Sequence, residues 1–384
     1  MNNVPNLRFP EFQGEWEKCI LGDITENFNL RNKDKIQYPM FSVTNDRGFV
    51  PQSEQFEGRD MVGEDIKAYK IIHTNDFAYN PARINVGSIA MYTGEKPCMI
   101  SSLYVCFKTT KEVNNEWLMQ LLKTPKMNYY YNVNGEGGVR VYLFYPNFAR
   151  IRMSIPKIEE QKKIAKLLNL IDERIATQNK IIEDLKKLKS AIIEMEYGHV
   201  TKSISHIGDF IEQTSKRNKD SAIQNVLSVS NSQGFIQQSE QFENRIVASD
   251  DTSNYKIVER NDFAFNPARI NVGSIARLTT FERGIVSPMY ICFRTKDNLF
   301  PEYLDYYFES KQFFTEIQKR LEGSVRQCLS FDGLCNIPLC IPSVENQQQI
   351  GKRLSALVQE IKLEIDFLEL LQKQKKFLLY KMFI

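Results

Sequence analysis

The sequence predicts an α+β protein built from two copies of one unit, each a mixed domain followed by a long helix. Three observations support this prediction. NDFAYNPARINVGSIA at 75–90 returns as NDFAFNPARINVGSIA at 261–276, with fifteen of sixteen residues identical and an offset of 186 positions. Short β-rich and helical runs alternate in each copy. Each copy ends in a charged segment that carries a regular stripe of Ile and Leu.

The same offset extends far beyond this stretch, so one duplication covers nearly the whole chain. Matching segments include RNKD at 31–34 and 217–220, QSEQFE at 52–57 and 238–243, and Ile155–Pro156 with Ile341–Pro342. No net insertion separates the copies, which is unlike a short-period solenoid. We therefore predict a first domain at 1–156, a spacer helix at 157–197, a second domain at 198–342 that begins with a linker at 198–205, and a second spacer helix at 343–384.

Each domain mixes strands with short helices. The segments SLYVCFKT at 102–109 and MYICFRT at 289–295 are rich in β-branched and aromatic residues, which predicts strands. The segments NNEWLMQLLKT at 114–124 and PEYLDYYFES at 301–310 have helical periodicity. Strand order does not follow from these patterns.

Each long helix is expected to start just after a proline, Pro156 or Pro342, a residue suited to helix entry. The stripes follow alternating steps of four and three residues, typical of a coiled coil. They consist of Ile164, Leu168, Ile171, Ile175, Ile182, Leu185 and Ile192, and of Ile350, Leu354, Leu357, Ile361, Leu368, Leu371 and Leu378. Polar residues interrupt both at matching places, Gln178 and Lys189 in one and Glu364 and Lys375 in the other.

Two equivalent helices in one chain favour mutual pairing about a pseudo-two-fold axis, which makes the coiled coil antiparallel. Gln178 and Glu364 lie near the middle of their stripes, so we expect a hydrogen bond between them that sets the register. The alternative is that each helix only covers its own domain.

Composition places the chain among globular proteins, with 42% hydrophobic and 25% charged residues. No run approaches the roughly 18 apolar residues of a membrane helix, and the N-terminus lacks the pattern of a secretory signal. Seven cysteines without a CxxC pair and three histidines predict no metal site and a cytoplasmic protein with reduced thiols. A net charge of +3 does not indicate nucleic acid by itself, so basic groups must be placed locally or supplied by a partner.

The duplicated stretch has side chains that suit the reading of DNA bases. Arginine and asparagine offer paired donors and acceptors for guanine and adenine edges in the major groove. The candidates for base readout are Asn80, Arg83, Asn85 and Ser88 in the first copy, Asn266, Arg269, Asn271 and Ser274 in the second, and Arg140 and Arg326 in the matching GGVR and GSVR loops. Arg31, Lys33, Arg217 and Lys219 in the RNKD loops suit phosphates.

The alternative is a structural turn in which Arg83 and Arg269 form ion pairs with Asp76 and Asp262. Enzyme motifs are weaker still. NPAR lacks the second proline and the aromatic residue of the amino-methyltransferase motif, and GEGG at 135–138 lacks the GK[ST] of a phosphate loop. With three histidines and no plausible Ser/His/Asp set, we interpret the chain as non-catalytic.

Several segments together resemble the specificity subunit of a type I restriction-modification system. They are the opening NLRFPEFQGEWEKCILGDI, the junction IPKIEEQKKIAKLLNLID, and the YNPARINVGSIA and G-x-V-R stretches. The resemblance covers essentially the whole chain. One departure is the second junction, IPSVENQQQIGKRLSALV, which replaces the EEQ and LID elements.

The resemblance implies two target-recognition domains joined by two spacer helices in an antiparallel coiled coil. It implies double-stranded DNA, two adenine methyltransferase subunits and motor-nuclease subunits as partners. S-adenosylmethionine is then expected on the methyltransferase, and ATP and Mg on the motor-nuclease, with no cofactor in this chain. The competing hypotheses are the recognition subunit of a related system that cuts on both sides of its site, and a duplicated scaffold without DNA.

Overall fold

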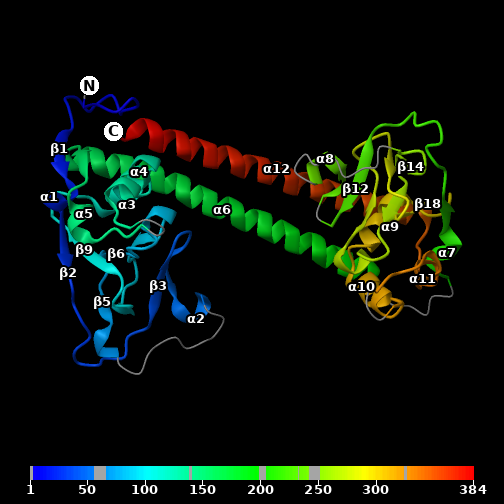
Figure 1. Cartoon of the computed structure of the whole chain (residues 1–384), viewed down its shortest axis with the longest axis horizontal. Coiled ribbons are helices and arrows are strands. Elements are labelled where there is room, and N and C mark those ends of the chain that lie inside the picture. Colours follow the sequence, from blue (N-terminus) through cyan, green and yellow to red (C-terminus); the bar gives the residue numbers. More distant parts are fainter. Residues whose placement is uncertain are drawn as a thin grey trace. The chain divides into compact units, whose positions relative to one another are not determined.

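The computed structural model describes residues 3–55, 66–137, 141–198, 205–231, 233–241, 251–323 and 327–384. The chain folds into two compact units, unit 1 with residues 1–179 and 366–384 and unit 2 with residues 180–365. Each unit holds one mixed α+β domain together with part of each long helix (Figure 1). The predicted linker at 198–205 lies mostly outside the described residues.

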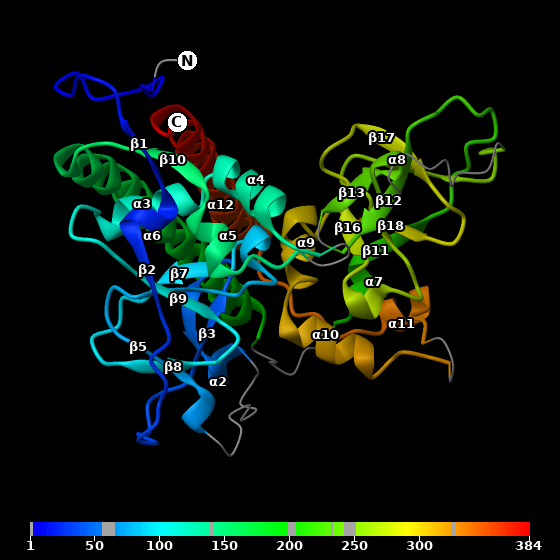
Figure 2. The same cartoon turned by 60° about the vertical axis from the view of Figure 1, so that its left-hand side comes forward.

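An antiparallel four-stranded sheet organises the domain of unit 1, in the order β2–β9–β6–β7. The strands are β2 (Thr25–Phe28), β9 (Val105–Thr109), β6 (Phe77–Tyr79) and β7 (Ile89–Met91). Figure 2 shows helices on one side of this sheet and further strands on the other. Because side chains alternate along a strand, Phe77 and Tyr79 enter the core on the helix side, and Ala78 enters a second core against the other strands.

The remaining elements of this domain cover the two faces of the sheet. The strands are β1 (Glu17–Ile20) paired with β10 (Arg152–Ile155), β3 (Phe41–Thr44) with β4 (Gly48–Pro51), and β5 (Lys70–Ile72) with β8 (Cys98–Ile100). The helices are α1 (Leu21–Ile24), α2 (Gln52–Gln55), η1 (Ile66–Ala68), η2 (Ile84–Val86), α3 (Asn115–Leu122), α4 (Pro125–Asn134) and α5 (Tyr145–Ala149). Side chains cap two of these helices, since Asn114 accepts from the Trp117 N–H and Thr124 accepts from the Met127 N–H.

Unit 2 repeats this design. Its central sheet has the order β11–β18–β15–β16, formed by β11 (Ile211–Thr214), β18 (Ile291–Thr295), β15 (Phe263–Phe265) and β16 (Ile275–Arg277). A second sheet has the order β13–β12–β17–β14, formed by β13 (Gly234–Gln237), β12 (Val226–Ser230), β17 (Arg283–Val286) and β14 (Lys256–Glu259). The helices are α7 (Ile207–Phe210), α8 (Gln238–Gln241), η3 (Ile270–Val272), α9 (Pro301–Tyr307), α10 (Lys311–Gln318) and α11 (Phe331–Cys335).

The sequence predictions for these elements are confirmed. The predicted strands at 102–109 and 289–295 are β9 and β18, and the predicted helices at 114–124 and 301–310 are α3 and α9. The end of the duplicated stretch forms a buried strand, although the stretch as a whole is rich in polar residues. Ile89 and Ala90 are buried in β7, because the polar residues of the stretch precede the strand.

The two long helices begin shortly after the predicted prolines. They are α6 (Ile158–Tyr197) and α12 (Val344–Met382). A buried glutamine fastens the first turn of each to its domain. Gln161 bonds to the backbone of Glu112, Asn114 and Pro156, at 2.8–3.1 Å. Gln347 makes the same three bonds to Asn298, Phe300 and Pro342, at 2.8–3.2 Å.

These two glutamines show that the second junction departs less from the first than expected. The segment ENQ at 345–347 keeps the glutamine of EEQ at 159–161 in the same role, and the difference that matters to packing is Asn346 in place of Glu160. Glu160 is buried and pairs with Arg8 at 2.7 Å and with the indole of Trp16 at 3.2 Å. An N-terminal arm therefore packs on the first junction.

Within unit 1, the start of α6 packs against the end of α12. Ile164 and Leu168 share a core with Leu378 and Met382. Farther along α6, Arg174 lies over the ring of Phe367, 5.6 Å from its centroid. The partner number falls as the α6 number rises, so the two helices run in opposite senses in this unit. All fourteen stripe residues are buried or half-buried.

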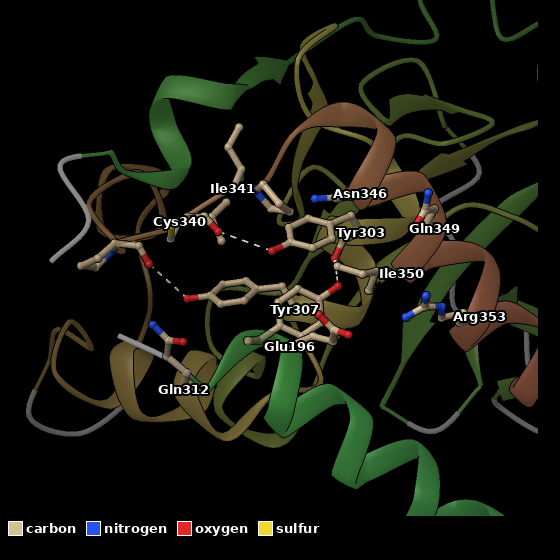
Figure 3. Close-up of a pocket in the computed structure, with 14 residues that line it drawn as sticks. Glu196, Tyr303, Tyr307, Gln312, Cys340, Ile341, Asn346, Gln349, Ile350 and Arg353 are labelled. Carbon is tan, nitrogen blue, oxygen red and sulfur yellow. Dashed lines mark hydrogen bonds between the residues drawn. The ribbon is translucent and has the colours of Figure 1, made fainter. Parts of the chain in front are cut away.

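In unit 2, two tyrosines of α9 bond to the segment 338–342 that leads into α12 (Figure 3). The hydroxyl of Tyr307 donates to the carbonyl of Pro338 at 3.3 Å, and that of Tyr303 donates to Cys340 at 3.4 Å. Tyr197 of α6 donates to the Tyr303 carbonyl at 2.7 Å. A cavity of about 480 Å³ lies among these residues, and none of the candidate DNA-reading side chains lines it.

Candidate nucleic-acid interface

We call residues 80–88 of unit 1 and 266–274 of unit 2 the reading loops. Their backbones close on themselves in the same way in both copies. The Asn80 N–H donates to the Ser88 carbonyl at 3.0 Å, and the N–H groups of Val86 and Ser88 donate to the Arg83 carbonyl at 3.2 and 3.1 Å. The matching bonds of Asn266, Val272 and Ser274 measure 3.0, 3.1 and 3.1 Å. Each reading loop therefore has a fixed shape of its own.

A glycine permits the bend that closes each reading loop. Gly87 has φ 99° and Gly273 has φ 89°, a left-handed conformation that other residues adopt with strain. A Cβ on Gly87 would also lie 3.3 Å from the Cβ and carbonyl oxygen of Asn45 in the β3–β4 turn. Both the turn and the close approach require glycine at this position.

Two residues anchor each reading loop to the domain beneath it. Ile84 and Ile270 are buried in the cores. Ser88 and Ser274 are also buried, and their hydroxyls donate to the carbonyls of Val43 and Val229 at 2.8 and 3.2 Å. This geometry assigns the serines a structural bond inside the domain, which occupies the hydroxyl hydrogen that base readout would use.

The asparagines at the start of the reading loops also stabilise the turn. The Oδ1 atoms of Asn80 and Asn266 accept the N–H groups of Ala82 and Ala268 at 3.0 and 3.1 Å. Both side chains are half-buried. Their amide nitrogens remain as donors for a base, so part of the predicted readout chemistry is still offered.

Arginine and asparagine side chains are left on the outside. Arg83, Arg269 and Asn271 are exposed, and Asn85 is half-buried. The alternative in which the arginines pair with Asp76 and Asp262 is wrong. Asp76 faces His73 at 3.7 Å and Asp262 pairs with Arg294 at 3.2 Å. Within the described residues neither arginine of the reading loops makes an ion pair, so both guanidiniums are available to a ligand.

One outward residue in each reading loop was not among the candidates selected from the sequence. Val86 and Val272 are 55% and 58% exposed at the loop surface. An apolar side chain beside Asn85 or Asn271 suits the methyl group of thymine, which is an apolar feature of the major groove. Both copies have a valine at this position, but a valine side chain has no hydrogen-bond donor or acceptor and so was not a candidate for base readout.

Neighbouring segments extend the candidate interface. In unit 1 the Asn85 amide donates to Asn132 of α4 at 3.0 Å. The Leu143 N–H donates to the Pro81 carbonyl, as Leu329 does to Pro267, both at 3.0 Å. The chain just after each G-x-V-R loop is therefore tied to a reading loop. Arg140 and Arg326 themselves lie outside the described residues.

The RNKD loops are held by a residue that the sequence analysis did not select. Asn32 and Asn218 are buried, and their amides bond to the backbone of Ile36 and Ile223 at 2.8–3.1 Å. The four predicted phosphate contacts, Arg31, Lys33, Arg217 and Lys219, are all exposed. Arg217 donates to Asn254 at 2.8 Å. These loops present cations from a fixed backbone.

The arrangement offers hydrogen bonding and positive charge. Among the described residues no group of three or more His, Cys, Asp or Glu is placed to hold a metal ion. Within that part of the chain, no helix is both long and apolar enough to cross a bilayer.

Comparison with known proteins gives consistent results. The family model described as "Type I restriction modification DNA specificity domain" matches residues 13–187 and again 202–373. The putative type I restriction enzyme MjaX specificity subunit of Methanocaldococcus jannaschii is 23% identical over 414 residues, covering 97% of this chain and 94% of that protein. The MjaVIII specificity subunit of the same organism is 23% identical over 408 residues, covering 96% and 92%.

Solved structures show the same fold. The type I restriction-modification S subunit from M. genitalium superposes with a TM-score of 0.59 at 13% identity, covering 99% of each chain. A chain from a study of assembly and conformational transition in the type I system superposes with a TM-score of 0.58 at 14% identity, covering 97% of this chain and 98% of the other.

Proposed function

This chain belongs to the type I restriction-modification DNA specificity family, and we propose that it reads a two-part DNA target with a fixed gap between the parts. One observation carries the proposal. The same reading loop is built twice with the same backbone bonds, and each copy presents an exposed arginine without an ion pair, Arg83 or Arg269, within the described residues. A rigid loop with a free guanidinium suits bidentate recognition of guanine.

The side chains take different roles in this proposal. Arg83 and Arg269 contact guanine, and Asn85 and Asn271 contact adenine or the backbone. Arg140 and Arg326 contact a base or a phosphate. Arg31, Lys33, Arg217 and Lys219 hold phosphates, which position the domain without specifying a sequence.

The domains are residues 1–156 and 198–342, and the spacer helices at 157–197 and 343–384 separate them as an antiparallel coiled coil about a pseudo-two-fold axis. The opposite course of the helices within unit 1 supports this pairing. The stripe from Ile164 to Ile192 covers 29 positions, about 43 Å at about 1.5 Å per residue. A strut of this order can hold two domains roughly one DNA turn, about 34 Å, apart.

The chain is non-catalytic in this proposal and works in the cytoplasm through its partners. Two methyltransferase subunits dock on it and carry S-adenosylmethionine, and motor-nuclease subunits carry ATP and Mg. Partners that wrap the DNA would also account for the small net charge of +3. A pull-down from the host tests this composition: a methyltransferase and an ATP-driven motor should accompany the chain, and their absence would contradict it.

Two nearly equal reading loops related by a two-fold axis should read nearly equal half-sites on opposite strands. We expect an interrupted, near-palindromic target, with one or two bases that differ because the domains differ elsewhere. Genome-wide mapping of methylated adenines in the host tests this directly. Two unrelated half-sites, or no defined two-part motif, would refute the proposal.

A further inference from the structure

The two reading loops are nearly identical in sequence but have different neighbours. In unit 1, Asn85 is half-buried and its Nδ2 donates to the Oδ1 of Asn132 on α4 at 3.0 Å. The position that matches Asn132 in unit 2 is Gln318, the last residue of α10. Gln318 and Asn271 are both exposed, and in the described part of unit 2 Asn271 makes no side-chain hydrogen bond.

The helix fixes which way the Asn85 amide points. The Nδ2 of Asn132 donates to the backbone carbonyl of Asn128 at 2.9 Å, and a carbonyl can only accept. The Oδ1 of Asn132 must therefore face Asn85, which has to meet it with a nitrogen. Among the described residues this leaves Asn85 with one amide hydrogen and its Oδ1 unused.

These two remaining groups are what adenine requires. An asparagine reads adenine in the major groove by donating to N7 and accepting from the N6 amino group. A fixed amide already has its donor and acceptor in place and loses less conformational freedom on binding. Since no described residue holds the Asn271 amide, it can exchange its donor and acceptor by turning over, and it must be ordered when DNA binds.

We propose that Asn132 is a positioning residue that orients Asn85, so that unit 1 discriminates the base at Asn85 more strictly than unit 2 does at Asn271. This inference rests on the proposed function. The two half-sites are then read with different stringency, even where they share the same preferred base. The specificity of a half-site thus depends on the helix beside the reading loop as well as on the loop.

The test uses the whole chain assembled with its methyltransferase subunits. Methylation is measured on a duplex library in which each position of each half-site is varied, and the readout is the ratio of best to second-best base at each position. Wild type should show a larger ratio at the Asn85 position than at the matching position of the other half-site. Asn132→Leu should lower that one ratio about tenfold, the scale of a weakened bidentate contact.

Two variants serve as controls. Asn132→Asp keeps an acceptor for Asn85 but cannot donate to the Asn128 carbonyl, so it should retain more of the ratio than Asn132→Leu does, and an equal loss in the two variants would contradict the positioning role. Gln318→Leu removes the matching side chain in unit 2 and should change neither half-site. Melting temperature should stay near wild type in all three variants, since both residues are exposed, and Gln318→Leu should also leave total methylation of the preferred duplex unchanged.

The outcomes separate this inference from the function on which it rests. If wild type has a defined two-part target and Arg83→Ala relaxes one half, but Asn132→Leu leaves every ratio within about twofold, only the inference is wrong. If wild type shows no defined target, the proposed function fails with it.

Discussion

At the scale of single residues, Tyr79 carries a buried hydroxyl that its counterpart in unit 2 lacks. Its hydroxyl is buried and, within the described part of the chain, has no hydrogen-bond partner, while unit 2 has Phe265 at the same place. Burial also raises the pKa of this hydroxyl far above its ordinary value. A buried polar group without a partner costs about 1–3 kcal/mol.

Tyr79→Phe should therefore raise the free energy of unfolding by about 1 kcal/mol, because it removes that cost and keeps the ring. Urea unfolding of the two proteins side by side measures the change. The converse variant Phe265→Tyr should destabilise unit 2, because it adds a hydroxyl to a ring that is fully buried in the apolar core. A loss of stability in Tyr79→Phe would show that the hydroxyl is bonded after all.

Arg83 carries the base-specific part of the proposed function. Arg83→Ala should relax the sequence preference in one half-site only, by about 1–3 kcal/mol for a bidentate contact. Arg269→Ala should relax the other half-site. Binding of the assembled complex to duplexes with single base changes measures both effects. An equal loss of affinity for unrelated DNA would mark the arginine as a phosphate contact.

Element packing differs between the units at the contact of the central sheet with the following helix. In unit 2 Arg277 of β16 reaches Asp305 of α9 at 3.1 Å and Glu302 at 3.5 Å. In unit 1 the matching positions are Met91 and Met119, which pack against the core. One copy thus uses an ion pair where the other uses an apolar contact.

The pair is largely sheltered, since the side chains of Arg277 and Asp305 are 10% and 31% exposed. Burial raises the pKa of the Asp305 carboxyl, and Arg277 opposes that shift. Lys189 acts in the same sense as Arg277, and Glu309 in the opposite sense. Loss of Arg277 would raise the pKa of Asp305 further. The charged Asp305 carboxylate then costs the most stability at pH values above this pKa, and the cost falls once the carboxyl is protonated.

Arg277→Met should destabilise unit 2 by about 1–3 kcal/mol near pH 7.5, less than a fully buried broken pair because Asp305 is partly exposed. The loss should shrink as the pH is lowered, because Asp305 takes up a proton when the pH falls through its raised pKa. Thermal unfolding over a series of decreasing pH values measures both effects. Arg277→Met with Asp305→Met copies unit 1 and should recover most of the stability; a double variant weaker than the single one would contradict this account.

At the scale of the whole molecule, the proposed function makes the long helices a ruler for the gap in the target. Inserting four residues at matching places in α6 and α12 should lengthen the unread gap of the target, because the proposed strut grows by about 6 Å. Methylation mapping of the variant measures the gap. An unchanged target would refute the role of the helices as a ruler.

Gln178 is buried although it is polar, and it lies in the middle of the first stripe. A buried polar residue in a coiled coil can specify register at some cost in stability. Replacing Gln178 and Glu364 together by Leu should therefore stabilise the helices and loosen their register, which would make the gap length less uniform. If assembly and target choice were unaltered in the double variant, the register role would be dismissed.

The sequence by itself determined the duplication, the main strands and helices of each domain and the start of both long helices, because these follow from local periodicity and from the repeat. It also selected Arg83 and Asn85 as outward groups by their chemistry. It could not separate them from Ser88 and Asn80, which lie in the same stretch but whose side chains bond to the backbone of Val43 and Ala82 within the domain.

Only the tertiary structure decided contacts between residues far apart in the chain. The bonds of Gln161 to Glu112 and of Asn85 to Asn132 join segments 47–49 positions apart, and no local pattern specifies which polar groups will meet. Burial works in the same way, because a serine or valine is placed inside or outside by the packing of the whole domain. Two nearly identical loops can therefore fold alike and still present side chains that have different neighbours.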